Sequence, residues 1–331
     1  MSGDDRLPWH RAQWQRVTDA RGDGRLPHAI LLAGVAGLGK TCFARRLAAA
    51  LACPGPGETG DACDACDACR QTAAGSHPDL LWVSPEEPGK AIKIDAVRRL
   101  TARSVLAAQQ GGHRVVVIDP ADAMNRAAAN ALLKTLEEPN SQTVLLLVSS
   151  QPDRLPATIR SRCQVVAFPV PARREARAWL ADRVDEHDVD QLLAISGGAP
   201  LRALQAGEQG WLQHDAELVA DLETLKRRKG NPLQVVEDWK NRPLTLLFDG
   251  FKRCVADMVR LKKVPEFEAI YHPQGRHDLQ SLGQGIDLKR LYVLNDELMR
   301  LDRDANNNLN PQMMLEYLMN RWLQITRTGG R

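Results

Sequence analysis

Uninterrupted apolar runs recur through the first half of the chain and predict buried strands. They are centred on Ala29–Ala33, Leu80–Val83, Arg114–Asp119 and Thr143–Val148. Short runs bounded by turn residues are typical of strands covered on both faces, as in a parallel sheet. Between them the apolar period becomes helical, most clearly in Thr41–Ala52 and Asn125–Glu138. Strands that alternate with helices predict an α/β domain with a parallel sheet.

The pattern changes after the Pro-Val-Pro segment at residues 169–171. Two helical patterns follow, Ala172–Val184 and Val189–Ile195, and the second ends at a Gly197-Gly198 break. Because both helices are short and amphipathic, they predict a small helical lid domain.

Beyond about residue 208 strand-like runs are lacking and helical periods dominate. One predicted helix repeats leucines at helical spacing, at Leu291, Leu294, Leu298 and Leu301. A last helix would place on its inner face Met314, Leu315, Leu318, Trp322 and Ile325. We therefore expect three domains, an α/β domain over residues 1–168, a lid over 169–208 and a helical domain over 209–331.

Composition places the chain among globular proteins and argues against a membrane protein. Of its 331 residues, 44% are apolar and 26% charged, and no stretch approaches the roughly 20 apolar residues that span a bilayer. The first residues lack the features of a secretion signal, so we expect a cytoplasmic protein without membrane contacts. The net charge of +3 does not by itself indicate nucleic-acid binding.

The strongest chemical signal is a phosphate-binding loop directly after the first predicted strand. Residues 34–41 read Gly-Val-Ala-Gly-Leu-Gly-Lys-Thr and match the G-x-x-x-x-G-K-T pattern. The backbone around Gly34, Gly37 and Gly39 would wrap phosphates, Lys40 would reach the terminal phosphates, and Thr41 would ligate Mg²⁺. The strand before the loop and the helix after it favour ATP or ADP binding over a structural glycine turn.

A second acidic element follows the third predicted strand. The apolar run that ends in Asp119 has the form of a Walker B element, whose carboxylate holds Mg²⁺ beside the phosphate loop. The next residue is usually Glu in hydrolytic relatives, whereas here it is Pro120, which can neither accept a proton nor orient water. The pattern predicts weak hydrolysis, with Asp122 as the nearest other carboxylate.

Four cysteines within residues 53–69 have the spacing C-x9-C-x2-C-x2-C and predict a metal site. Cys53, Cys63, Cys66 and Cys69 alternate with Gly, Pro and Asp, which suits a tetrahedral, structural Zn²⁺ without an open position. Disulfides are disfavoured in a reducing compartment, and an iron–sulfur cluster is the remaining alternative from ligand type.

Several motifs together resemble one family. Residues 130–139, Ser149-Ser150 and the Leu155–Gln164 segment are similar to the AAA+ core of sliding-clamp loaders, and the four-cysteine insertion is similar to that of bacterial subunits of DNA polymerase III. Three features are more similar to the delta prime subunits than to the gamma/tau motor subunits. They are Pro120, a chain end near residue 331 and the segment 92–100. The gamma/tau type stays the alternative.

The resemblance implies further roles. Arg162, in the Ser-Arg-Cys motif, would act as an arginine finger on the ATP site of a neighbouring subunit, although a lone arginine more often forms a surface salt bridge. Ser149 or Ser150 would occupy the sensor 1 position, and Arg202 the sensor 2 position. The C-terminal domain would be a collar in a hetero-oligomeric ring with gamma/tau and delta subunits.

The same resemblance implies that the ring loads the beta sliding clamp onto primer–template DNA. Two alternative functions, from other classes of protein, stay open. One is a metabolic kinase or nucleotide transferase, for which no acceptor-substrate residues are visible. The other is a zinc-stabilised scaffold with a vestigial loop, which nucleotide binding would distinguish.

Overall fold

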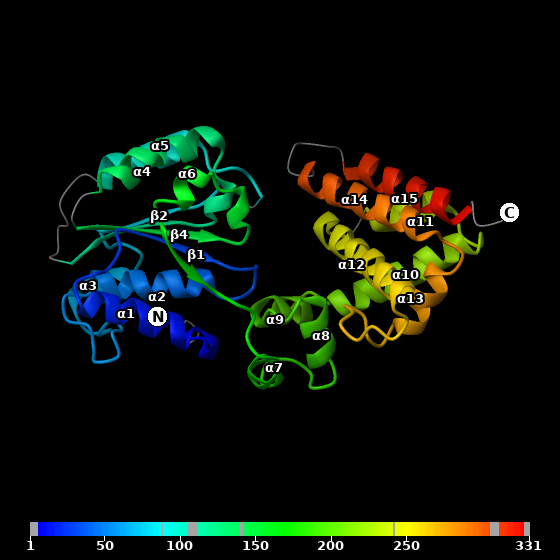
Figure 1. Ribbon diagram of the computed structural model, residues 1–331, viewed down its shortest axis with the longest axis horizontal. Coiled ribbons are helices and arrows are strands. Elements are labelled where there is room, and N and C mark those ends of the chain that lie inside the picture. The colour runs from blue at the N-terminus through cyan, green and yellow to red at the C-terminus, as the bar shows by residue number, and fades with distance from the viewer. Residues whose placement is uncertain are drawn as a thin grey trace. The chain divides into compact units, whose positions relative to one another are not determined.

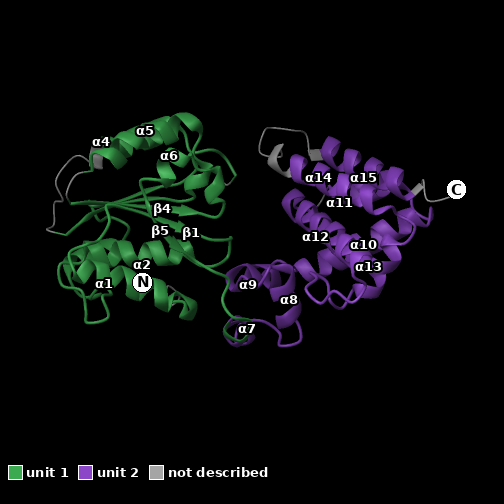
Figure 2. Ribbon diagram, in the orientation of Figure 1, with its two compact units in different colours: residues 1–175 green, residues 176–331 purple. Residues whose placement is uncertain are grey.

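The computed structural model describes residues 6–87, 89–104, 112–139, 142–240, 242–304 and 311–327. The chain forms two compact units, residues 1–175 and 176–331 (Figure 2). This division does not decide the expected boundaries at residues 168 and 208, which stay predictions. Each unit has its own hydrophobic core.

The first unit is built on a five-stranded parallel sheet with the order β2-β3-β4-β1-β5. Its strands are β1 (Ala29–Ala33), β2 (Leu80–Val83), β3 (Arg114–Ile118), β4 (Thr143–Ser149) and β5 (Gln164–Ala167). All four neighbouring pairs run parallel, and Leu31 of β1 lies opposite Leu147 of β4 and Val165 of β5. The four predicted strands are confirmed. The edge strand β5 escaped prediction because most of its side chains are exposed.

Helices cover both faces of this sheet (Figure 1). They are α1 (Arg11–Gly22), α2 (Lys40–Ala52), α3 (Asp67–Ala73), α4 (Ile94–Ser104), α5 (Arg126–Glu137) and α6 (Ala157–Arg160). Alternate strand residues such as Leu31 and Leu145 share a buried cluster with Val97 of α4 and Leu132 of α5. The helix α5 begins where the Asn125 side chain accepts the Ala128 N–H at 2.8 Å, as an N-cap should.

All the regular elements in the described residues of the second unit are helices, and loops join them. Its helices are α7 (Arg173–Ala181), α8 (Val189–Ile195), α9 (Pro200–Glu208), α10 (Trp211–Lys226), α11 (Pro232–Trp239), α12 (Leu244–Lys263), α13 (Arg276–Gly283), α14 (Leu288–Asp304) and α15 (Pro311–Arg327). The predicted inner faces of α14 and α15 are buried except at Leu301, which is partly buried, and Leu298 and Trp322 are fully enclosed. None of the described helices is long and apolar enough to cross a membrane.

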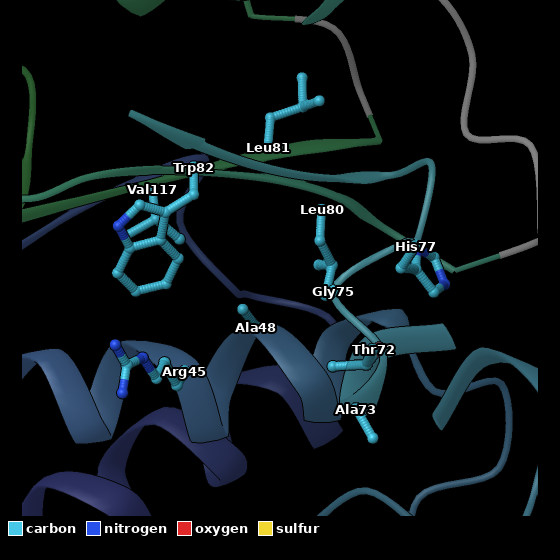
Figure 3. Close-up of a pocket in the computed structure, with 10 residues that line it drawn as sticks. All are labelled: Arg45, Ala48, Thr72, Ala73, Gly75, His77, Leu80, Leu81, Trp82 and Val117. Carbon is cyan, nitrogen blue, oxygen red and sulfur yellow. The ribbon is translucent and has the colours of Figure 1, made fainter. Parts of the chain in front are cut away.

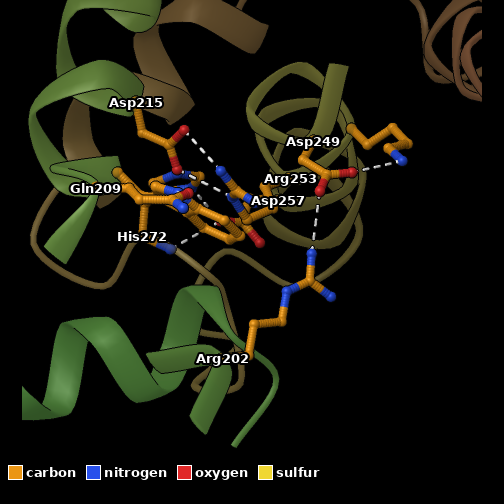
Figure 4. A network of polar contacts seen from close by, with 9 residues as sticks. Arg202, Gln209, Asp215, Asp249, Arg253, Asp257 and His272 are labelled. Atoms are coloured by element: carbon orange, nitrogen blue, oxygen red, sulfur yellow. Dashed lines mark hydrogen bonds and ion pairs between the residues drawn. The ribbon is translucent and has the colours of Figure 1, made fainter. Parts of the chain in front are cut away.

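A buried polar network joins α10, α12 and the segment before α13 (Figure 4). Arg253 donates two hydrogen bonds to Asp215, at 2.9 and 2.8 Å. The ring of His272 lies between two carboxylates, with Nε2 at 3.0 Å from Asp215 and Nδ1 at 2.9 Å from Asp257. Each buried charge therefore has an opposite charge beside it, which offsets the cost of removing it from water.

Candidate functional site

The phosphate loop joins the end of β1 to the start of α2. Gly37 and Gly39 adopt φ angles of 83° and 81°, which other residues rarely adopt. At Gly34 a side chain would collide with the carbonyl oxygen of Phe168. The glycines predicted from the pattern therefore stand where the backbone requires them.

Lys40 points back into the loop that precedes it. Its Nζ donates hydrogen bonds to the Val35 carbonyl at 2.7 Å and to Ser150 Oγ at 3.1 Å. Burial lowers the pKa of Lys40 to about 8, although the charges of Asp119 and Asp122 oppose the change. The ammonium is thus held at the carboxyl edge of the sheet, where terminal phosphates would lie.

Thr41 and Asp119 are brought together as the pattern predicts. Thr41 Oγ1 donates a 2.7 Å hydrogen bond to Asp119 Oδ2, which links the start of α2 to the end of β3. Burial raises the pKa of Asp119, and the hydrogen bond from Thr41 works in the opposite direction. A hydroxyl and a carboxylate so placed are oxygen donors of the kind that Mg²⁺ binds together with phosphates. The residues present therefore fit Mg²⁺ with a nucleotide.

Asp122 and the two serines complete this edge of the sheet. Asp122 Oδ1 accepts the Ser150 N–H at 3.0 Å, so the carboxylate does face the loop region. Ser149 Oγ instead accepts the Gln151 N–H at 3.2 Å. The structure therefore brings Ser150, and not Ser149, to Lys40; the sensor role of either serine stays a prediction.

Two residues near the start of the described chain also contact the loop, and sequence reasoning missed them. Trp9 Nε1 donates to the Leu38 carbonyl at 2.9 Å, and His10 Nε2 lies 2.7 Å from the same oxygen. Burial lowers the pKa of His10 to about 4, so the ring is neutral at pH 7. No motif marks this contact, since it depends on the fold of Pro8–His10 against the loop.

Arg162 follows α6 on the surface of the first unit. Its guanidinium lies 2.8 Å from Glu137 Oε1 and donates to the Thr158 carbonyl at 3.0 Å. The side chain keeps 37% of its surface exposed. The ion pair is the surface salt bridge that a lone arginine ordinarily forms. The exposed part of the guanidinium is accessible to another chain. The role of Arg162 as an arginine finger stays a prediction.

Arg202 lies on α9 in the second unit and pairs with Asp249 at 3.1 Å (Figure 4). Its guanidinium carbon also lies 5.5 Å from the centre of the Trp211 ring. These contacts give the side chain a structural role within its own unit. The predicted sensor role is not tested by them.

The four cysteines converge as predicted. Their Sγ atoms all lie within 4.8 Å of one another, and the Cys53–Cys66 and Cys63–Cys69 pairs are 3.9 and 3.8 Å apart. A tetrahedron of thiolates around Zn²⁺, with bonds of about 2.3 Å, requires S–S distances of about 3.8 Å. The cluster therefore fits a four-coordinate metal.

The cysteine segment is tied to the helix of the phosphate loop. Arg46 of α2 donates two hydrogen bonds to Asp61, at 2.5 and 2.9 Å, and its guanidinium lies 3.6 Å from the Trp14 ring centre. Cys53 is itself the C-terminal cap of α2. The cysteine segment, residues 53–69, is thus packed against the rest of the first unit.

A cavity of about 340 Å³ is lined by residues of α2, α3 and β2 (Figure 3). Its walls include Arg45 of α2, Trp82 of β2 and His77, which precedes β2, and the guanidinium carbon of Arg45 lies 5.7 Å from the Trp82 ring centre. Residues 34–41 do not line it, so this cavity is distinct from the nucleotide site.

The parallel sheet, the loop after β1, the acidic residue after β3 and the helical second unit define the class of AAA+ proteins. Residues 9–172 match a family model described as DNA polymerase III, delta subunit. The chain is 38% identical to DNA polymerase III subunit delta' of Pseudomonas aeruginosa, over 98% of this chain and 99% of that protein. The chain therefore belongs to the family of DNA polymerase III delta prime subunits.

Two further comparisons agree with this assignment. The delta' subunit of Haemophilus influenzae is 32% identical over 93% of this chain and 94% of that protein. The tau subunit of DNA polymerase III of Salmonella typhimurium is 39% identical, but over 42% of this chain and 21% of that protein. Similarity to the delta' subunits thus extends through both units, whereas similarity to this tau subunit is confined to a part.

Proposed function

We propose that this chain is a stator-like subunit of a DNA polymerase III clamp loader. It would join gamma/tau and delta subunits in a hetero-oligomeric ring in the cytoplasm, and the ring would load the beta clamp onto primer–template DNA with ATP. Membership of the delta prime family supports this assignment. Pro120 also supports it, because a motor subunit needs a carboxylate at this position to activate water.

The observation that carries the proposal is the exposed, restrained guanidinium of Arg162. Glu137 and the Thr158 carbonyl hold the side chain at the surface, and over a third of it stays accessible. Presented to a γ-phosphate in a neighbouring subunit, the guanidinium would offset charge that develops during phosphoryl transfer. Arginine fingers of this kind accelerate transfer by about 10³ to 10⁵ in other systems.

The test is the ATPase activity of the assembled loader, stimulated by clamp and primed DNA. Complexes with gamma and delta subunits would contain the parent chain, Arg162→Ala or the control Arg160→Ala. Arg160 lies two residues away and pairs with exposed Asp153 at 2.9 Å, so its loss removes a similar surface ion pair. We expect at least a tenfold drop for Arg162→Ala alone, with assembly preserved. Equal turnover in all three complexes would leave Arg162 with a structural role.

The chain itself would bind ATP or ADP with Mg²⁺ at residues 34–41 and hydrolyse ATP slowly. The contacts of Lys40 and Thr41 support binding, and Pro120 explains slow turnover. Zn²⁺ at the four cysteines would have a structural role, since four protein ligands leave no open position.

The gamma/tau-type motor remains the second candidate. The placement of Asp122 beside Ser150 favours it, because a carboxylate near the terminal phosphates is what hydrolysis requires. Hydrolysis by the purified chain that depends on Lys40 would support the motor reading and contradict the stator reading.

A further inference from the structure

We infer that Trp9 and His10 are positioning residues of the nucleotide site, acting through the peptide group between Leu38 and Gly39. This inference rests on the proposed binding of nucleotide. Both side chains donate to one acceptor, the Leu38 carbonyl, at 2.9 and 2.7 Å. The two donors are neighbours in the Pro8–His10 turn, so a single turn of chain supplies both.

The geometry of a trans peptide links the orientation of the Leu38 carbonyl to that of the Gly39 N–H. The C=O of Leu38 and the N–H of Gly39 belong to the same planar group and point in opposite directions. When Trp9 and His10 hold the carbonyl on one side, the Gly39 N–H is turned toward the other side. In G-x-x-x-x-G-K-T loops the backbone N–H groups on that side bind the phosphates.

Lys40 restrains the loop at Val35, whereas Trp9 and His10 restrain it at Leu38. Leu38 stands between Gly37 and Gly39, both in the left-handed region, and glycine backbones reorient easily. Rotation of the Leu38–Gly39 peptide changes ψ of Leu38 and φ of Gly39, and because a glycine accepts either sign of φ, this peptide could turn over at lower cost than one between two other residues. Two hydrogen bonds to its carbonyl would hold one orientation.

The donors are themselves fixed by an aromatic cluster. The ring of His10 is fully buried and lies edge-to-face with Phe43 at 5.6 Å and with Phe168 at 5.1 Å. A carbonyl oxygen can only accept, so the Nε2 of the neutral ring carries the proton. Phe43 belongs to α2, which follows the loop, and Phe168 follows β5, the strand beside β1. The cluster therefore connects the helix after the loop to the edge of the sheet.

The experiment compares three variants of the full chain: His10→Phe, Trp9→Phe and the control Trp14→Phe. The first two keep an aromatic ring and remove one donor each. Trp14 lies in the same cluster, 5.6 Å from Phe43, but its indole donates to Thr59 and not to the loop. A loss of packing would affect all three variants, whereas a loss of loop orientation affects the first two.

The first measurement needs no nucleotide. In chain labelled with ¹⁵N-glycine, the amide resonance of Gly39 should shift in His10→Phe and Trp9→Phe, because the carbonyl of the same peptide loses a hydrogen bond. Trp14→Phe should leave the Gly39 amide unchanged. If the Gly39 amide is the same in all variants, the positioning role is rejected whether or not the chain binds nucleotide.

The second measurement uses calorimetric titration with ADP and with inorganic pyrophosphate, each with Mg²⁺. Each donor-deleted variant should bind both probes about tenfold more weakly than the parent, because one hydrogen bond of about 1.4 kcal/mol corresponds to that factor. A loss for ADP alone would contradict an action on the phosphate chain. Absence of binding by the parent would reject the proposed nucleotide site, and the Gly39 amide resonance would then still decide the positioning role.

Discussion

Thr41 Oγ1 lies 2.7 Å from Asp119 Oδ2, so the hydroxyl and carboxylate expected to share Mg²⁺ are already in contact. The contact joins the start of α2 to the residue that follows β3, two positions that are far apart in the chain. Because both groups sit on rigid elements, Mg²⁺ would replace the hydrogen bond with little rearrangement.

Asp119→Asn should weaken the Mg²⁺-dependent part of nucleotide binding. The amide keeps the shape but loses the charge, and a charged contact is worth about 1.5–3 kcal/mol, or about tenfold to hundredfold in affinity. Titration calorimetry with ADP would measure this, in Mg²⁺ and in EDTA. The control Asp153→Asn removes an exposed carboxylate and should bind as the parent does. Equal losses with and without Mg²⁺ would exclude metal binding by Asp119.

Nucleotide affinity should fall as the pH rises above about 8. Burial lowers the pKa of Lys40 to about 8, so above that pH the free chain holds a neutral amine. Phosphates favour the charged form, and binding must then take up a proton, which costs about tenfold in affinity per pH unit. In Lys40→Arg, whose guanidinium stays charged, the dependence should disappear even if the affinity is lower. An equally steep decline in that variant would place the titration elsewhere.

The chain should contain about one Zn²⁺, and loss of the metal should unfold its module. The thiolates of Cys66 and Cys69 complete the tetrahedral set, so replacing both with Ser should abolish zinc binding and lower the melting temperature. Replacement of Cys254, which is buried in the second unit, serves as the control and should retain the metal. Elemental analysis that finds iron, or no metal, would overturn the zinc assignment.

His272 should make stability depend on pH near neutrality. Burial alone would lower the pKa of His272, but hydrogen bonds to Asp215 and Asp257 outweigh it and raise the pKa. The contribution is therefore complete below the unfolded pKa of about 6.5 and is lost as the pH rises through the folded pKa. Within that window the free energy of unfolding should fall by about 1.4 kcal/mol per pH unit from this residue.

Urea unfolding of the parent, His272→Gln and His277→Gln between pH 5.5 and 9 would measure this slope. His272→Gln should lack the slope and be less stable at pH 6 by about 3 kcal/mol, because two buried carboxylates each lose one charged partner. His277 is almost fully exposed, so its variant should follow the parent. A slope that persists in His272→Gln would assign the titration to another group.

The elements that sequence predicted are those whose signal is local. Apolar runs specify β1, β3 and β4, and the N-cap Asn125 marks the start of α5. The metal cluster was predictable because all four ligands lie in one short segment. The phosphate loop was predictable because its chemistry requires glycine at fixed positions.

What sequence did not predict depends on contacts between distant segments. Trp9 and His10 contact Leu38 only in the folded chain. His272, which precedes α13, contacts Asp215 of α10, which is far from it in the sequence. Ser149 and Ser150 are adjacent at a strand end, where a period of two cannot tell which side chain turns toward Lys40. Such choices are made by tertiary packing and leave no pattern in the chain.

The helix α2 begins at the phosphate loop with Lys40 and is capped at its other end by Cys53 of the metal cluster. Over its 13 residues it is a rod of about 20 Å, held by backbone hydrogen bonds along its whole length. The proposed nucleotide site and the cysteine cluster therefore lie at opposite ends of one helix. By thermodynamic linkage, a chain that loses affinity for nucleotide when its metal is chelated must also hold its metal more tightly when nucleotide is bound.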